Sequence, residues 1–171
     1  ALPICTLRMN EQVYISDTNI WIDLQNAGLL DKLFNLPFLI SCTDFVLNEL
    51  TGFDHQHLID MGLVIEALDE QATASLIGLM RSHNNSSVAD VSCFQLASET
   101  GRPLLTGDRR LRIQAQSNGL QVHGVLWLLD QMLAHQVITA HEAGVGLQNM
   151  LACGARLPVE EVRRRLALWS S

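Results

Sequence analysis

Four acidic residues that are far apart in the sequence stand next to segments typical of β-strands or helix starts. They are Asp17, Glu49, Asp90 and Asp108. Carboxylates that meet in one cleft repel each other and raise one another's pKa unless a cation neutralises their charge. Hard oxygen ligands of this kind suit Mg²⁺ or Mn²⁺, which can activate a water molecule and stabilise the charge that builds on a phosphodiester during in-line attack. The residue types therefore predict metal-dependent hydrolysis of a phosphodiester, provided that the fold brings the four acids together.

Short apolar runs alternate with helical patterns along the chain as far as Gly124. Strands are expected at residues 13–16, 38–41, 64–67, 103–106 and 120–122. Helices are expected between them at residues 44–50, 71–81, 89–99 and 109–115. This alternation is typical of an α/β fold with a mostly parallel sheet. Ligands of such sheets bind outside the carboxyl ends of the strands, where the strand order reverses. Asp17 and Asp108 follow two of the expected strands, so we expect both at that edge.

After Gly124 the alternation stops and three helical segments follow. They are expected at residues 125–134, from Thr139 to about 152, and 158–168. Thr139 and Glu142 have the spacing of a capping box, in which each side chain accepts a hydrogen bond from the other residue's backbone. We therefore expect one nuclease-like α/β domain over residues 1–123, with residues 124–171 as a helical C-terminal extension packed on the same domain.

Composition limits the classes of protein that the chain can belong to. No apolar run approaches the roughly 18 to 20 residues that cross a bilayer, so a cytoplasmic protein without a membrane is expected. The four cysteines stand far apart, which favours structural thiols over a zinc site. The net charge of −7 is unusual for a protein that binds nucleic acid through its phosphates. A nucleic-acid enzyme of this composition would have to concentrate its negative charge where a divalent cation reverses the local sign.

The four acids stand in short motifs that occur in a fixed order. The motifs are Tyr-Ile-Ser-Asp-Thr-Asn-Ile (residues 14–20), Val-Leu-Asn-Glu-Leu (46–50), Ser-Val-Ala-Asp (87–90) and Leu-Thr-Gly-Asp-Arg-Arg-Leu (105–111). In order and spacing they resemble the motifs of the PIN-domain family of ribonucleases, including bacterial VapC-type toxins. The resemblance covers about residues 13–122 and implies a three-layer α/β/α fold with a central, mostly parallel sheet of about five strands, plus the C-terminal helices.

The same resemblance implies an activity and a set of partners. It implies an endoribonuclease that depends on Mg²⁺ or Mn²⁺ and cuts single-stranded RNA, often as the toxin of a type II toxin–antitoxin pair. Partners implied are the RNA substrate, a cognate antitoxin that covers the acidic cleft, and a second copy of the chain in a homodimer. The metal would be held by Asp17, Asp90, Asp108 and Glu49.

Supporting roles are expected for residues beside the acids. Asn19 would orient Asp17, and Thr106 would be its hydrogen-bonding companion at a strand end. Arg109, Arg110 and Arg112 follow Asp108 and are candidates for phosphate contacts, although runs of arginine are more often solvated helix faces.

Structural explanations of the same residues remain open. Asp17 could end a strand as a turn residue, Asp90 and Asp108 could stabilise helix starts, and Glu49 could be an exposed helix residue. The imidazoles of His55 and His57 are expected in a solvated loop. The indoles of Trp21, Trp127 and Trp169 are expected in the core.

Alternative functions also remain open. A catalytically inactive PIN-like module that binds RNA or protein is the main one. A phosphatase would have a second aspartate where this chain has Asn19. A receiver domain would have a lysine after a late strand, whereas Lys32 is the only lysine.

Overall fold

A five-stranded parallel sheet forms the centre of the computed structural model, which describes residues 12–81 and 87–171. The strand order is β3-β2-β1-β4-β5, and every neighbouring pair is parallel. The strands are β1 (Val13–Ser16), β2 (Leu39–Thr43), β3 (Val64–Glu66), β4 (Leu104–Leu105) and β5 (Val122–His123). The predicted sheet is therefore confirmed. The bounds of β1 are those expected, and the other strands begin or end one or two residues away from their predicted bounds.

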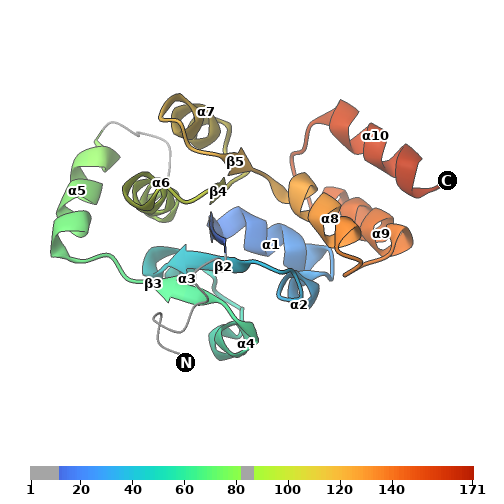
Figure 1. The fold of residues 1–171 in the computed structure, drawn as a ribbon, viewed down its shortest axis with the longest axis horizontal. Helices are drawn as coiled ribbons and strands as arrows, with labels where there is room; N and C mark the ends of the chain where they lie inside the picture. Colours follow the sequence, from blue (N-terminus) through green and yellow to red (C-terminus); the bar gives the residue numbers. More distant parts are fainter. Residues whose placement is uncertain (1–11, 82–86) are drawn as a thin grey trace.

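Helices cover both faces of this sheet. Figure 1 shows α6 and α7 on one side and α2 and α4 on the other, so the three-layer α/β/α prediction is also confirmed. No helix in residues 12–81 and 87–171 is long and apolar enough to cross a membrane. The helices up to the last strand are α1 (Thr18–Asn26), α2 (Leu30–Leu33), α3 (Asp44–Glu49), α4 (His55–Met61), α5 (Glu70–Met80), α6 (Val88–Thr100) and α7 (Arg109–Ser117).

Three of these helices, α1, α2 and α4, are absent from the sequence prediction. The prediction that His55 and His57 lie in a loop is wrong, because both belong to the first turn of α4. That helix is short and mostly polar, so it has little apolar periodicity. Asp54 caps it by accepting a hydrogen bond from the backbone of His57, and Leu58 anchors it in the core. The helix α3 is capped by the hydroxyl of Thr43, which accepts a hydrogen bond from the backbone N–H of Val46.

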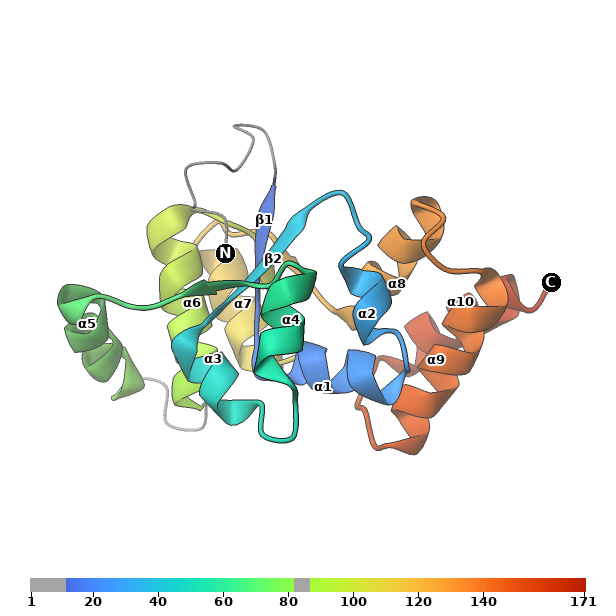
Figure 2. The same ribbon diagram turned by 90° about the horizontal axis from the view of Figure 1, so that it is seen from below.

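The last three helices lie together at one end of the molecule, beyond α1 and opposite α5 (Figures 1 and 2). Their apolar side chains belong to the same buried cluster as those of the sheet. Thr139 and Glu142 form both hydrogen bonds of the predicted capping box. The helices are α8 (Val125–Ala134), α9 (Ala140–Ala152) and α10 (Val159–Trp169).

A glycine allows α9 to approach the turn that follows α1. A Cβ atom at Gly146 would lie 2.8 Å from Cδ1 of Leu29 and 3.4 Å from the carbonyl oxygen of Ala27. Both neighbours are buried, so they have little room to move. The seam between the helical extension and the rest of the chain therefore depends on a residue without a side chain.

The strand order creates the edge on which a site is expected. From β1 the chain goes first to β2 and β3 on one side, then crosses to β4 and β5 on the other. The order thus reverses between β1 and β4, whose register pairs Ser16 with Leu105. Parallel sheets bind their ligands at the carboxyl ends of the strands at this point.

Candidate active site

Asp17 lies directly after β1 at the strand-order reversal and is fully buried. It begins α1 as the N-cap, with Oδ1 accepting a hydrogen bond from the backbone N–H of Ile20 at 3.1 Å. Oδ2 accepts a hydrogen bond from the hydroxyl of Thr106 at 2.5 Å. Burial raises the pKa of Asp17 to about 7, although the hydrogen bond from Thr106 opposes this rise. These hydrogen bonds hold the carboxylate in a buried position where its negative charge is unfavourable. A nearby cation lowers the free-energy cost of that charge.

Thr106 connects the ends of the two central strands. Besides donating to Asp17, its Oγ1 accepts a hydrogen bond from the backbone N–H of Asp108 at 3.0 Å. Asp108 then caps α7 through Oδ1, which accepts from the backbone N–H groups of Arg110 and Leu111. Both cap bonds use one oxygen, so Oδ2 of Asp108 stays available for a ligand. The structural and functional explanations of Asp108 are therefore compatible.

Glu49 reaches the site from the last position of α3. It is exposed, and its Oε2 accepts a hydrogen bond from the hydroxyl of Thr18 at 2.8 Å. Thr18 follows Asp17 directly, so this bond holds Glu49 next to the buried acid. Sequence reasoning missed Thr18, and the only available signal was its place inside the Asp-Thr-Asn triplet.

Asp90 joins the other acids electrostatically. It lies in the first turn of α6, where its backbone N–H donates to the hydroxyl of Ser87 at 3.1 Å. The pKa of Asp90 is raised to about 6, mainly by burial and then by the negative charges of Asp108 and Glu49. The charge of Asp90 in turn raises the pKa of Asp17. The fold therefore brings the four predicted acids close enough to interact.

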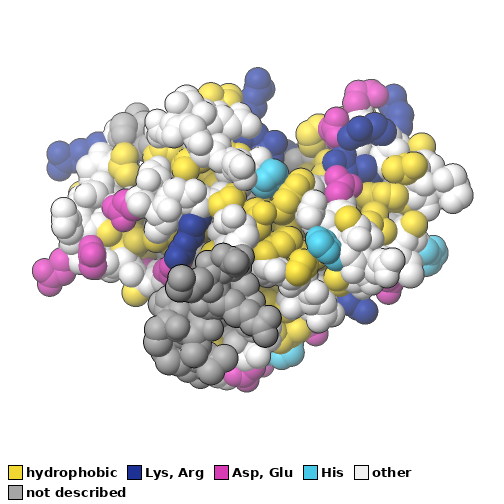
Figure 3. Space-filling model, in the orientation of Figure 1, with side chains coloured by type: hydrophobic (Ala, Val, Ile, Leu, Met, Phe, Trp, Pro, Cys, Tyr) yellow, Lys and Arg dark blue, Asp and Glu magenta, His cyan; other side chains and the backbone are white. Residues whose placement is uncertain are grey.

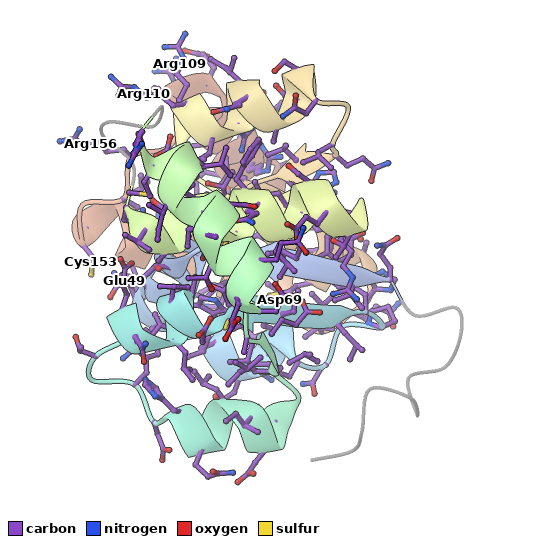
Figure 4. All side chains as sticks on the ribbon, turned by 90° about the vertical axis from the view of Figure 1, so that its left-hand side faces the viewer. Glu49, Asp69, Arg109, Arg110, Cys153 and Arg156 are labelled. Carbon is purple, nitrogen blue, oxygen red and sulfur yellow. The ribbon has the colours of Figure 1, made fainter. Side chains whose placement is uncertain are left out.

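The predicted supporting residues have different surroundings. Thr106 is the expected companion of Asp17, whereas Asn19 is exposed and makes no hydrogen bond to that carboxylate within the described residues. Arg109 and Arg112 line the cleft beside Asp108, and Arg110 is exposed outside that lining. Figure 4 shows Glu49, Arg109 and Arg110 along the same edge of the molecule.

The described side chains fit a hydrated divalent ion better than a closed ligand cage. Within residues 12–81 and 87–171 no three His, Cys, Asp or Glu side chains form a group that could hold a metal by themselves. Mg²⁺ usually keeps several waters and takes only one or two carboxylates from the protein. Two buried acids of raised pKa, with two more acids within electrostatic range, match that donor chemistry.

The cysteines and tryptophans divide between core and surface. Cys42 and Cys93 are buried, as expected of structural thiols, but Cys153 is exposed, and Cys5 lies outside the described residues. Trp21 is fully buried. Trp127 and Trp169 are half-buried and pack against the core cluster, so all three indoles contact the core, although only Trp21 is fully enclosed by it.

The fold and the acidic edge define a PIN-type α/β/α protein. A family model described as DUF3368: PIN domain matches residues 13–171. The chain belongs to this PIN-domain family, as its motifs predict. The match includes α8, α9 and α10, so the family pattern extends over the C-terminal helices as well as the sheet.

One solved structure shows the same fold at low sequence identity. The chain is similar to a PilT N-terminus domain protein from the hyperthermophilic archaeon Sulfolobus solfataricus, with 14% identity and a TM-score of 0.51 over 71% of this chain and 94% of that chain. It is also similar to VapBC2 from Rickettsia felis, whose structure is bound to a DNA fragment from its promoter. That match has 18% identity and a TM-score of 0.42 over 66% of this chain and 98% of that chain. A search of the curated proteins finds no match.

Proposed function

We propose that this protein is a metal-dependent endoribonuclease that hydrolyses single-stranded RNA with Mg²⁺ or Mn²⁺. The observation that carries the proposal is the buried carboxylate of Asp17 at the β1–β4 reversal, with Asp90, Asp108 and Glu49 around it. A buried carboxylate with like charges around it is costly in free energy unless a cation compensates the charge. Membership of the PIN-domain family supports nuclease activity at this edge.

The four acids and Thr106 have different roles in this proposal. Asp17, Asp90 and Asp108 would bind the ion, and Glu49 would bind it directly or through water. The ion supplies an activated water and stabilises negative charge on the phosphodiester. Thr106 fixes the orientation of Asp17, and the chain needs no side-chain nucleophile.

The test is cleavage of labelled single-stranded RNA with Mg²⁺, with Mn²⁺ and with a chelator. Asp17→Asn and Asp108→Asn should lose cleavage but stay folded, because asparagine caps helices nearly as well as aspartate. Asp69→Asn is the matched control, since Asp69 caps α5 and lies away from the edge that carries Glu49 (Figure 4). Cleavage that ignores the chelator, or that survives both site variants, would contradict the proposal.

The toxin role is a further part of the proposal and rests on the motifs. A cognate antitoxin would cover the acids with a basic segment, and two copies of this chain would form a homodimer. Expression of the parent should then arrest bacterial growth, and expression of Asp17→Asn should not. Equal growth with both proteins would contradict the toxin role, and light scattering would measure the homodimer.

An inactive PIN-like module remains the alternative function. It predicts RNA binding without cleavage under every metal condition. Retention of all four acids at one edge favours the enzyme, because a binding module gains nothing from crowded carboxylates.

A further inference from the structure

A cleft of about 930 Å³ extends from the acid site to the C-terminal helices. One wall contains Asn19 of α1 and Asp108 at the start of α7. The opposite wall is the segment 153–158, which joins α9 to α10. The volume lies in the range of about 300 to 1,000 Å³ that is typical of ligand sites. The C-terminal helices therefore form half of a cleft whose other half carries a candidate catalytic acid.

Positive charge is concentrated in this cleft. Four of the chain's 11 Lys and Arg residues line it, namely Arg109, Arg112, Arg156 and Arg165. Figure 3 shows dark blue side chains on both sides of the hollow between α7 and α10. The same lining contains the acids Asp23, Asp108 and Glu161, so the cleft has four cationic side chains against three carboxylates. This local balance favours an anion more than the net charge of −7 of the whole chain does.

The four arginines differ in how free their charges are. Arg165 is held by ion pairs with Asp130 and Glu161. Arg112 donates a hydrogen bond through Nη2 to the carbonyl oxygen of Thr106, so the backbone partly holds its charge. Arg109 and Arg156 are exposed and make no hydrogen bond or ion pair with the described residues. These two guanidinium groups are available to a ligand.

The floor of the cleft adds an aromatic surface. The rings of His123 and Trp127 are stacked, with centroids 4.0 Å apart and an interplanar angle of 14°. Both residues line the cleft and are half-buried. The Trp127 ring also stacks on Phe38, with centroids 5.9 Å apart, so His123 is the ring of this pair that remains for a base. Proteins that hold single-stranded nucleic acid combine cations along the backbone with aromatic faces on which bases stack. This pairing favours a nucleic acid strand over an acidic peptide.

We propose that this cleft is the path of the single-stranded RNA substrate, with Arg156 of the α9–α10 segment binding a phosphate at a distance from the acids. Arg109 binds a phosphate next to Asp108, and a base packs against His123. The proposal rests on the proposed function for the identity of the strand. It gives the C-terminal helices a direct role in substrate binding.

Kinetics of Arg156→Ala test the path. For a long oligouridylate, KM should rise about 3- to 5-fold, the effect of losing one exposed ion pair, with kcat unchanged. The salt dependence of binding should lose about 0.7 from its slope, the share of one phosphate contact. A dinucleotide has only the scissile phosphate and no second phosphate for Arg156, so parent and variant should cut it equally well. Arg81→Ala, which removes an exposed arginine at the C-terminal end of α5 that does not line the cleft, should change none of these quantities.

Cys153 provides a test that does not depend on cleavage. It is exposed on the same wall as Arg156, and Figure 4 shows both along the edge that carries Glu49. In a Cys5→Ser background, a maleimide should modify Cys153, because Cys42 and Cys93 are buried. Oligouridylate should slow this modification in parent protein, and Arg156→Ala should need more oligouridylate for the same protection.

The two tests separate failure of the path from failure of the enzyme. Cleavage with unprotected Cys153 and an unchanged KM in Arg156→Ala would overturn the path and leave the nuclease intact. Protection of Cys153 without any cleavage would support the path and contradict the nuclease.

Discussion

Asp17→Asn should make the metal-free protein more stable while abolishing cleavage. The change removes a negative charge from a fully buried position but keeps nearly the same shape. The Oδ1 atom of asparagine can still accept the hydrogen bond from the backbone of Ile20 that begins α1. The group that is lost is the Oδ2 acceptor of the hydroxyl of Thr106.

The magnitude follows from the pKa of Asp17. Burial raises it from 3.8 to about 7, so the folded state holds the proton more tightly than the unfolded state. The stability of the parent therefore falls as pH rises from about 4 to 7, and the ionised carboxylate costs on the order of 4 kcal/mol at neutral pH. Loss of the Thr106 hydrogen bond costs about 1 kcal/mol or more. The variant should gain about 1 to 3 kcal/mol in its free energy of unfolding, since part of the burial cost is relieved by local relaxation.

Urea unfolding with a chelator, at about pH 8 where the carboxylate is ionised, measures this gain. Mg²⁺ should then stabilise the parent by about 1.4 kcal/mol at a free concentration ten times its Kd, and should stabilise the variant much less. The control is Asp69→Asn, an exposed N-cap replacement that should change stability by only a few tenths of a kcal/mol. A metal-free Asp17→Asn protein that is less stable than the parent would refute the reasoning, because the hydrogen bonds of the carboxylate would then outweigh its burial.

Three further predictions concern stability. Gly146→Ala should lower the free energy of unfolding in urea by about 1 to 2 kcal/mol, because the new Cβ would meet Leu29. Gly144→Ala in the same helix has open space around the new Cβ and should raise it by about 0.5 to 1 kcal/mol. Equal effects would contradict the close packing of α9. Burial raises the pKa of Asp23 to about 6, so the parent loses stability between about pH 4 and 6, and Asp23→Asn should show a small gain in Tm over the parent above that range and none below it. Thr139→Ala should cost about 0.5 to 2 kcal/mol by removing the cap of α9, and an unchanged Tm would show that α9 does not need its cap.

The sequence by itself determined the elements whose signals are local. Apolar runs with polar ends predicted β1 to β5, and the paired Thr139 and Glu142 predicted the start of α9. The four acidic motifs and their order along the chain predicted the PIN-domain family. This was possible because each motif consists of neighbouring residues. The helix α4 was not predicted, because the stability of a short polar helix depends on its cap and on one core contact.

Only the tertiary structure decided how the acids are held and what faces them. Thr18 binding Glu49 and Thr106 binding Asp17 join residues 31 and 89 positions apart, and no local pattern reports such contacts. The same is true of Arg156, which lines the same cleft as Asp108 although the two are far apart in the sequence. Spacing along the chain specifies local geometry, whereas proximity between distant residues depends on the packing of whole helices against the sheet.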